Sequence, residues 1–87
     1  MSMYKKNALN QLMITYKQFL EEYKNEISSQ EAFNLAKEYE METWKEQLEA
    51  YKSNSKENGL SIKKAIKICK VMINELSKIK TTDILNK

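Results

Sequence analysis

At 87 residues the chain can form one domain at most, with a single small hydrophobic core. Pro and His are absent and Gly and Cys occur once each, which excludes hairpin-rich sheets, phosphate-binding glycine loops and the usual zinc sites. The formal net charge is only +3. All 15 basic residues are Lys, so the chain has no Arg that could hydrogen-bond the base edges of nucleic acid.

The first predicted helix spans about residues 3–26. Its apolar side chains fall within an arc of roughly 140° on a helical wheel. They are Ala8, Leu9, Leu12, Met13, Tyr16, Phe19, Leu20, Tyr23 and Ile27. Ile14 is the one apolar residue on the opposite, polar side. We therefore expect one face of this helix to be buried.

The second predicted helix spans residues 29–53. Ser28 and Glu31 have the spacing of a capping box, in which each side chain accepts a hydrogen bond from the other residue's backbone N–H. The apolar side comprises Ala32, Phe33, Ala36, Tyr39, Thr43, Trp44, Leu48 and Tyr51. Because this stripe drifts by roughly 100° from one end of the helix to the other, it indicates two contact surfaces.

The third predicted helix spans residues 62–79, after a loop at 53–61. Gly59 suits a left-handed cap that ends the second helix, and Ser61 suits the N-cap of the third. The third helix has the clearest apolar stripe, with Ile68 at its edge. The stripe comprises Ile62, Ala65, Ile66, Cys69, Met72, Ile73, Leu76 and Ile79. In the tail, residues 80–87, we expect a short final turn capped by Thr81 or Thr82.

Three amphipathic helices with short connections predict an all-α fold, a three-helix up-down-up bundle over the single domain 1–87. The structural alternative is a helical hairpin that completes its core by homodimerisation. No run of 18 apolar residues occurs and the N-terminus lacks the apolar stretch of a secretory signal. We therefore expect a cytoplasmic protein that does not associate with membranes.

Catalytic, metal-binding and cofactor-binding residues are not predicted. Without His the ordinary general base near neutral pH is missing. Cys69 lies on the apolar face of a helix, where Cys acts as a small hydrophobic residue. A single row of Glu on the second helix cannot surround a hard cation with six oxygen ligands. We therefore expect a protein that is not an enzyme and uses no cofactor.

The charges are distributed unevenly along the chain. The first helix sums to +1 (four Lys, three Glu) and the second to −3 (three Lys, six Glu), whereas the third sums to +5 with Lys80 included (six Lys, one Glu). One side of the third helix forms a polar row, consisting of Lys63, Lys67, Lys70, Asn74 and Lys78. Such a row predicts contact with an acidic partner or with nucleic-acid phosphates. The alternative is a solvated face that pairs with the acidic second helix.

A second set of residues predicts contact with a protein. Trp44, Leu48 and Tyr51 lie on one flank of the second helix, and Met41 is an apolar residue on its polar side. Aromatic residues that anchor an apolar patch are typical of protein interfaces. We therefore expect a regulatory, inhibitory or adaptor protein that binds another protein or a second copy of itself. Small helical proteins of this kind are common among the products of mobile elements. The alternative function is nucleic-acid binding through the polar row of the third helix.

Overall fold

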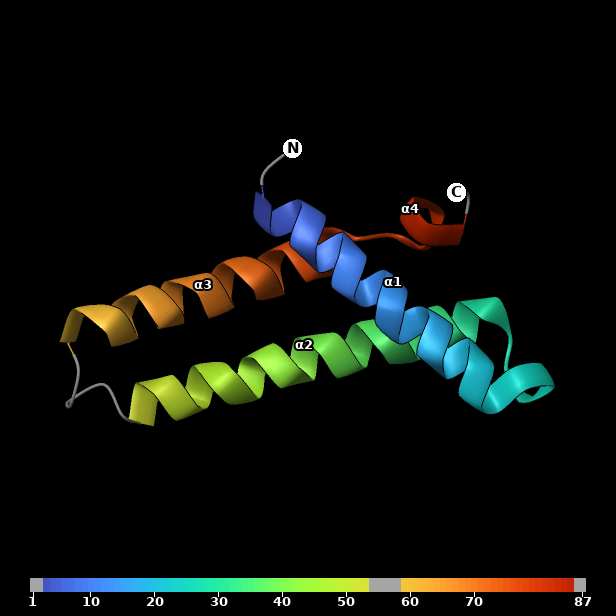
Figure 1. The fold of residues 1–87 in the computed structure, drawn as a ribbon, viewed down its shortest axis with the longest axis horizontal. Helices are drawn as coiled ribbons and strands as arrows, with labels where there is room; N and C mark the ends of the chain where they lie inside the picture. Colours follow the sequence, from blue (N-terminus) through green and yellow to red (C-terminus); the bar gives the residue numbers. More distant parts are fainter. Residues whose placement is uncertain (1–2, 54–58, 86–87) are drawn as a thin grey trace.

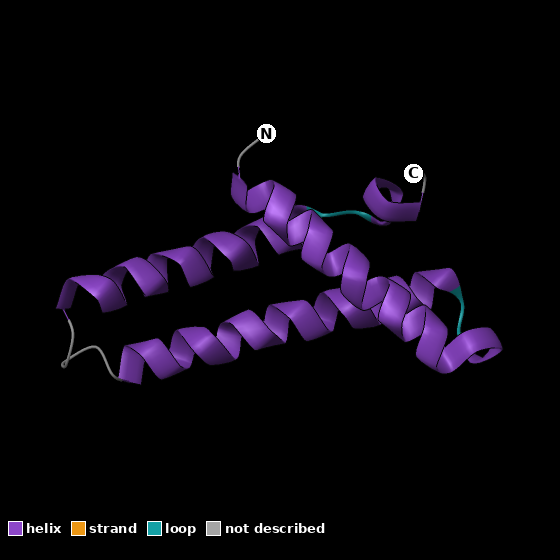
Figure 2. Cartoon of the chain, viewed as in Figure 1, coloured by secondary structure: helices purple, strands orange, loops and turns teal. Residues whose placement is uncertain are grey.

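The computed structural model describes residues 3–53 and 59–85, and every regular element in these ranges is a helix (Figures 1 and 2). The elements are α1 (Met3–Tyr23), the 3₁₀ turn η1 (Lys24–Glu26), α2 (Ser29–Ser53), α3 (Gly59–Lys78) and α4 (Thr81–Leu85). The three long helices pack against one another. The prediction of an all-α bundle is therefore confirmed.

α2 and α3 form a long antiparallel hairpin, and α1 crosses it diagonally (Figure 1). The crossing lies at the end of the hairpin that is remote from the connection between α2 and α3. The molecule is elongated, with extents of 47 × 27 × 15 Å. Its radius of gyration is 14.7 Å, compared with about 12 Å for a compact domain of this length. α1 therefore covers only part of the hairpin.

The core lies where α1 crosses the hairpin. Its buried residues come from all three long helices, from the connection after α3 and from α4, and they are Ala8, Leu12, Tyr16, Ala32, Phe33, Ala36, Met72, Leu76, Ile79 and Ile84. In the described part of the hairpin, no residue of α2 after Glu40 and no residue of α3 from Ser61 to Ile68 is buried. The core consequently ends about halfway along the hairpin.

Two polar contacts that the sequence did not predict join the helices of the core. The Thr15 hydroxyl of α1 donates a hydrogen bond of 2.8 Å to Oε2 of Glu40 in α2, and both residues are buried. Lys37 Nζ of α2 donates to the carbonyl oxygens of Ser77 (3.1 Å) and Ile79 (2.8 Å) at the C-terminal end of α3. Lys37 thus supplies a positive charge where the helix dipole is negative.

The ends of the helices test the predicted caps. The capping box before α2 is confirmed, because the Ser28 hydroxyl accepts from Glu31 N–H and the Glu31 carboxylate accepts from Ser28 N–H, each at 3.1 Å. The predicted final turn forms as α4, but its Thr cap is wrong. Instead, the Asp83 carboxylate accepts from Lys80 N–H at 2.8 Å, because an acidic side chain at the third helical position can reach back to that donor.

The predicted start of the third helix is also wrong. α3 begins at Gly59, so Gly59 is not a left-handed cap of α2 and Ser61 is not an N-cap. Glycine is unfavourable mainly in the interior of a helix, so the first turn of α3 can include it. Of the rest of the predicted loop, Ser53 is the last residue of α2, and residues 54–58 lie outside the described residues.

Candidate functional site

The half of the hairpin that α1 leaves uncovered consists of residues 41–53 of α2 and 59–68 of α3, and we call it the free arm (Figure 1). Its inner side chains are half-buried: Trp44, Leu48 and Tyr51 from α2, and Ile62, Ala65 and Ile66 from α3. Two helices alone cannot enclose these side chains, because the third helix of the bundle crosses elsewhere. The free arm therefore exposes apolar surface that the core does not use.

The predicted protein-binding residues lie partly against the core. Met41 and Trp44 are half-buried and pack against the core cluster. Leu48 and Tyr51 are also half-buried, but they lie farther along the free arm and are not among the residues packed on that cluster. Trp44 therefore divides its surface between the core and the free arm.

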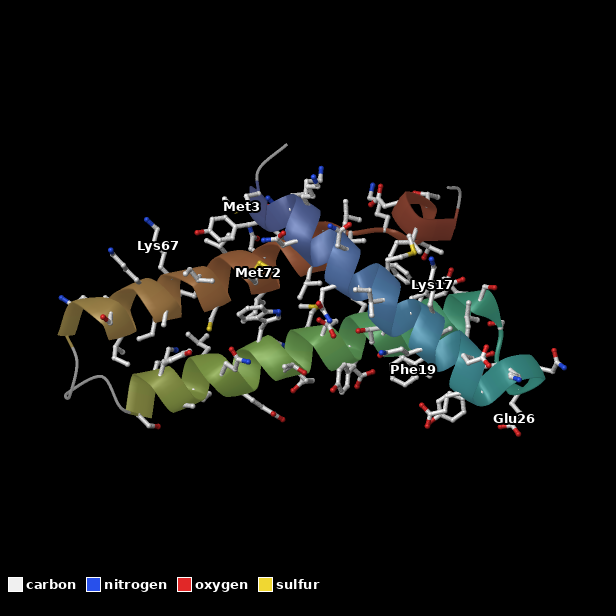
Figure 3. The ribbon with its side chains drawn as sticks, in the orientation of Figure 1. Met3, Lys17, Phe19, Glu26, Lys67 and Met72 are labelled. Atoms are coloured by element: carbon white, nitrogen blue, oxygen red, sulfur yellow. The ribbon has the colours of Figure 1, made fainter. Side chains whose placement is uncertain are left out.

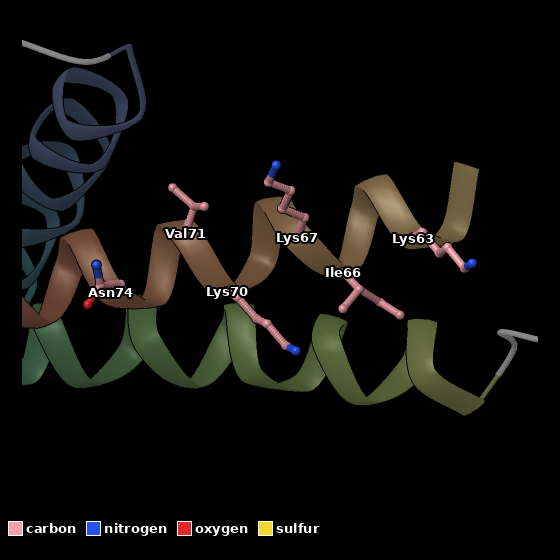
Figure 4. Close-up of a pocket in the computed structure, with 6 residues that line it drawn as sticks. All are labelled: Lys63, Ile66, Lys67, Lys70, Val71 and Asn74. Atoms are coloured by element: carbon pink, nitrogen blue, oxygen red, sulfur yellow. The ribbon is translucent and has the colours of Figure 1, made fainter. Parts of the chain in front are cut away.

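Four of the five predicted polar-row residues line one open depression on α3. Lys63, Lys67, Lys70 and Asn74 are all exposed, and the aliphatic side chains of Ile66 and Val71 complete the lining. Figure 4 shows Asn74 at the end of this row nearest α1 and Lys63 at the far end. Lys78 lies in a different depression with Leu9 and Ile79, and its Nζ lies 3.9 Å from a Glu75 carboxylate oxygen. Lys78 therefore lines a different depression from the other four residues of the predicted row, one helical turn beyond Asn74 on the same helix.

The four lysines between positions 63 and 70 take part in no ion pair with any residue that the structure describes. The ion pairs that do form join residues three positions apart in sequence, such as Lys45 with Glu42 at 3.7 Å. The opposite charges of α2 and α3 thus produce no ion pair between these helices in the described chain. These four lysines are therefore available to an anionic partner.

A second open depression adjoins the first. It is lined by Tyr4 of α1 and by Lys64, Lys67, Ile68 and Val71 of α3, so the two depressions share Lys67 and Val71. We call the combined area the α3 surface. It consists of Tyr4, Lys63, Lys64, Ile66, Lys67, Ile68, Lys70, Val71 and Asn74.

The apolar part of the α3 surface is substantial. Tyr4 is 39% exposed and Ile68 is 38% exposed. Sequence reasoning missed Tyr4, because its contact with α3 depends on the diagonal crossing of α1. The position of Ile68 at the edge of the apolar stripe was the available signal. The α3 surface therefore combines four lysines with an aromatic and three aliphatic side chains.

Another exposed surface lies at the opposite end of the molecule. The rings of Phe19 and Tyr23 stack with centroids 6.0 Å apart, and Tyr39 meets Phe19 edge-on at 6.2 Å. Tyr39 is 57% exposed and Tyr23 is 38% exposed, and Glu22 lines a depression beside Phe19 and Tyr39. We call Phe19, Glu22, Tyr23 and Tyr39 the α1-end surface. Phe19 itself is half-buried and packs against the core. Sequence reasoning assigned all three aromatic residues to apolar stripes and so missed the exposure of Tyr23 and Tyr39.

The described residues hold little reactive chemistry. They contain no group of three or more His, Cys, Asp or Glu that could hold a metal ion. Cys69 is buried, and burial raises the pKa of its thiol above the ordinary value of 9.0, which disfavours the reactive thiolate. None of the described helices is both long enough and apolar enough to cross a membrane.

Comparison with known proteins adds no assignment. No protein-family model, no curated protein and no solved structure matches the chain. The function must therefore be inferred from the surfaces of the molecule itself.

Proposed function

We propose that this chain is a non-catalytic regulatory or adaptor protein, acting in the cytoplasm, that binds an acidic protein surface, on another protein or on a second copy of itself, through the α3 surface. The observation that carries the proposal is that two adjoining depressions bring together exposed Tyr4 and Ile68, half-buried Val71 and four lysines that form no ion pair with a described residue. Protein interfaces characteristically surround an apolar and aromatic centre with charged groups. Electrostatic complementarity then selects the partner and accelerates association.

The total surface of the chain supports a binding role. Its accessible area is 6261 Å², whereas a compact monomer of this mass exposes about 5,400 Å². The excess is comparable to the roughly 800 Å² that each partner buries in a standard protein interface. The elongated shape, with extents of 47 × 27 × 15 Å, accounts for a larger area than a compact domain would expose.

A protein partner fits the α3 surface better than nucleic acid does. A phosphate backbone would contact the lysines, but it would leave Tyr4, Ile68 and Val71 without apolar contacts. The chain has no Arg, which is the usual bidentate reader of guanine and phosphate. Nucleic-acid binding stays the second candidate because Lys63, Lys67 and Lys70, which pair with no acidic residue in the described ranges, follow one side of a helix, as phosphate contact requires.

The test is affinity capture from the native source with nuclease-treated extract. The triple variant Lys63→Ser/Lys67→Ser/Lys70→Ser should lose the captured protein. A matched control, Lys17→Ser/Lys24→Ser/Lys80→Ser, removes the same charge from exposed positions outside the α3 surface and should retain it. Equal capture by both variants would refute the proposal.

An electrophoretic mobility assay distinguishes nucleic-acid binding, the second candidate, from protein binding. DNA or RNA that shifts at low salt, and whose shift weakens as salt rises and vanishes in the α3 variant, would support nucleic-acid binding instead. Absence of any shift at low salt would eliminate that candidate.

A further inference from the structure

The two exposed surfaces of the chain have complementary chemistry. Residues 63–71 of the α3 surface contain four Lys and no acidic residue, giving +4. The α1-end surface contains one acidic residue, Glu22, and no basic residue. The segment that continues past it, residues 21–26, sums to −2 (three Glu and one Lys), with Glu21 paired to Lys24 at 3.5 Å. We infer that the acidic partner of the α3 surface is the α1-end surface of a second copy of this chain. This inference rests on the proposed function and specifies its partner.

The side chains on the two surfaces suit each other beyond net charge. Tyr23 and Tyr39 present exposed aromatic rings, and an ammonium group placed over such a ring is attracted to its negative face. Ile68 and Val71 offer aliphatic contacts to the same rings. Glu22 lies beside these aromatic residues and can pair with a lysine of the neighbouring copy. One α1-end surface thus supplies both an anionic and an apolar partner.

The positions of the surfaces determine the kind of assembly. Figure 3 shows Phe19 and Glu26 at one end of the molecule and Lys67 toward the other, along the axis whose extent is 47 Å. One copy can therefore engage two neighbours at once, one through each surface. Contact between two different surfaces is heterologous, so it produces a growing chain of copies unless the rotation closes a ring. The assembly differs from the alternative that the sequence offered, a helical hairpin that completes its core by homodimerisation.

Sedimentation velocity across a range of protein concentrations tests the inference directly. At low salt the mean mass of the wild-type chain should rise continuously from low micromolar to near-millimolar concentration. Physiological salt should shift the distribution back toward the monomer, because exposed charges are screened. The variant Lys63→Ser/Lys67→Ser/Lys70→Ser should lower the association constant by about tenfold or more.

A mixing experiment gives the sharpest test. The α3 variant above has lost the basic surface but keeps the acidic one, whereas Glu22→Gln/Tyr39→Ser has lost the acidic surface but keeps the basic one. Each variant alone should be monomeric, and an equal mixture should form a one-to-one dimer and nothing larger. Both sets of positions are exposed, so helical content by circular dichroism should match that of the wild type.

The remaining outcomes overturn the inference in distinguishable ways. A wild-type chain that stays monomeric at every concentration and salt refutes self-association. The capture experiment then decides the proposed function separately. A discrete dimer that Glu22→Gln/Tyr39→Ser leaves intact would show a two-fold contact, for which the free arm is the available surface.

Discussion

α3 carries one continuous apolar stripe, yet its two halves have different surroundings. From Cys69 onward the stripe contributes buried residues, among them Met72 and Leu76, because α1 crosses over it. Before Cys69, Ile62, Ala65 and Ile66 have the same spacing and remain half-buried. Helical periodicity therefore predicts which side of a helix is apolar, whereas the crossing of a third helix decides how much of that side becomes core.

The largest expected difference is in the loss of stability when a leucine is truncated in the core under α1 or in the free arm. Leu12→Ala should lower the free energy of unfolding by about 2–5 kcal/mol, because Leu12 is fully buried and its truncation leaves a cavity. Leu48→Ala, in the free arm, should cost less than about half as much, since the site is already partly hydrated. Urea unfolding of both variants measures the comparison. Equal losses would mean that the free arm is as fully packed as the covered half.

The buried polar contact of the covered half should have the next largest effect. Thr15→Val removes the hydroxyl that donates to Glu40 and should cost about 1–3 kcal/mol, because a buried acceptor loses its donor. Thr43→Val is the matched control. The Thr43 hydroxyl donates to the Tyr39 carbonyl of its own helix and is only half-buried, so we expect a much smaller change. Chemical denaturation of both variants would detect the difference.

A smaller effect is expected at the end of α3. Lys37→Met keeps the apolar stem, which lies near the Phe33 ring, but removes the ammonium group that donates to Ser77 and Ile79. The loss should be about 1 kcal/mol, typical of a cation at a helix C-terminus. Lys45→Met serves as the control, because Lys45 forms only an exposed pair with Glu42 that should be worth about 0–1 kcal/mol. Indistinguishable unfolding midpoints for the two variants would contradict this role of Lys37.

The smallest effect should appear only in alkaline solution. Burial raises the pKa of Cys69 in the folded chain, so the folded state retains the thiol proton more strongly than the unfolded state does. The resulting stabilisation is fully present below the ordinary pKa of 9.0 and is lost as pH rises through the folded-state pKa. Cys69→Ala should therefore be less sensitive than the wild type to a rise in pH from neutral to above 9. Parallel urea titrations at the two pH values measure this difference.

Much of the fold followed from local signals. The apolar periodicity predicted three helices, and the Ser28–Glu31 spacing predicted a cap that forms as expected. The start of α3 at Gly59 was missed, because one glycine is compatible with either a helix end or a first turn. The buried Thr15–Glu40 contact was missed because Glu40 is one of six Glu residues on its helix, and Glu side chains on a helix are usually exposed to solvent.

The candidate site was only partly predictable for a different reason. Lys63, Lys67, Lys70 and Asn74 share a depression because they are neighbours on one helix, and sequence spacing describes such neighbours well. Tyr4 and the Phe19–Tyr39 contact depend on how α1 crosses the other helices. Nothing in the local sequence specifies that crossing.

The early end of the core also has a dynamic consequence. Because the free arm contributes no buried residue in its described part, its turns can open one after another while the packing under α1 stays intact. Backbone amides of the free arm should therefore exchange with deuterium through local opening, whereas those near Leu12 and Leu76 should exchange only when the whole chain unfolds. A partner that binds the arm would slow the first kind of exchange and leave the second nearly unchanged.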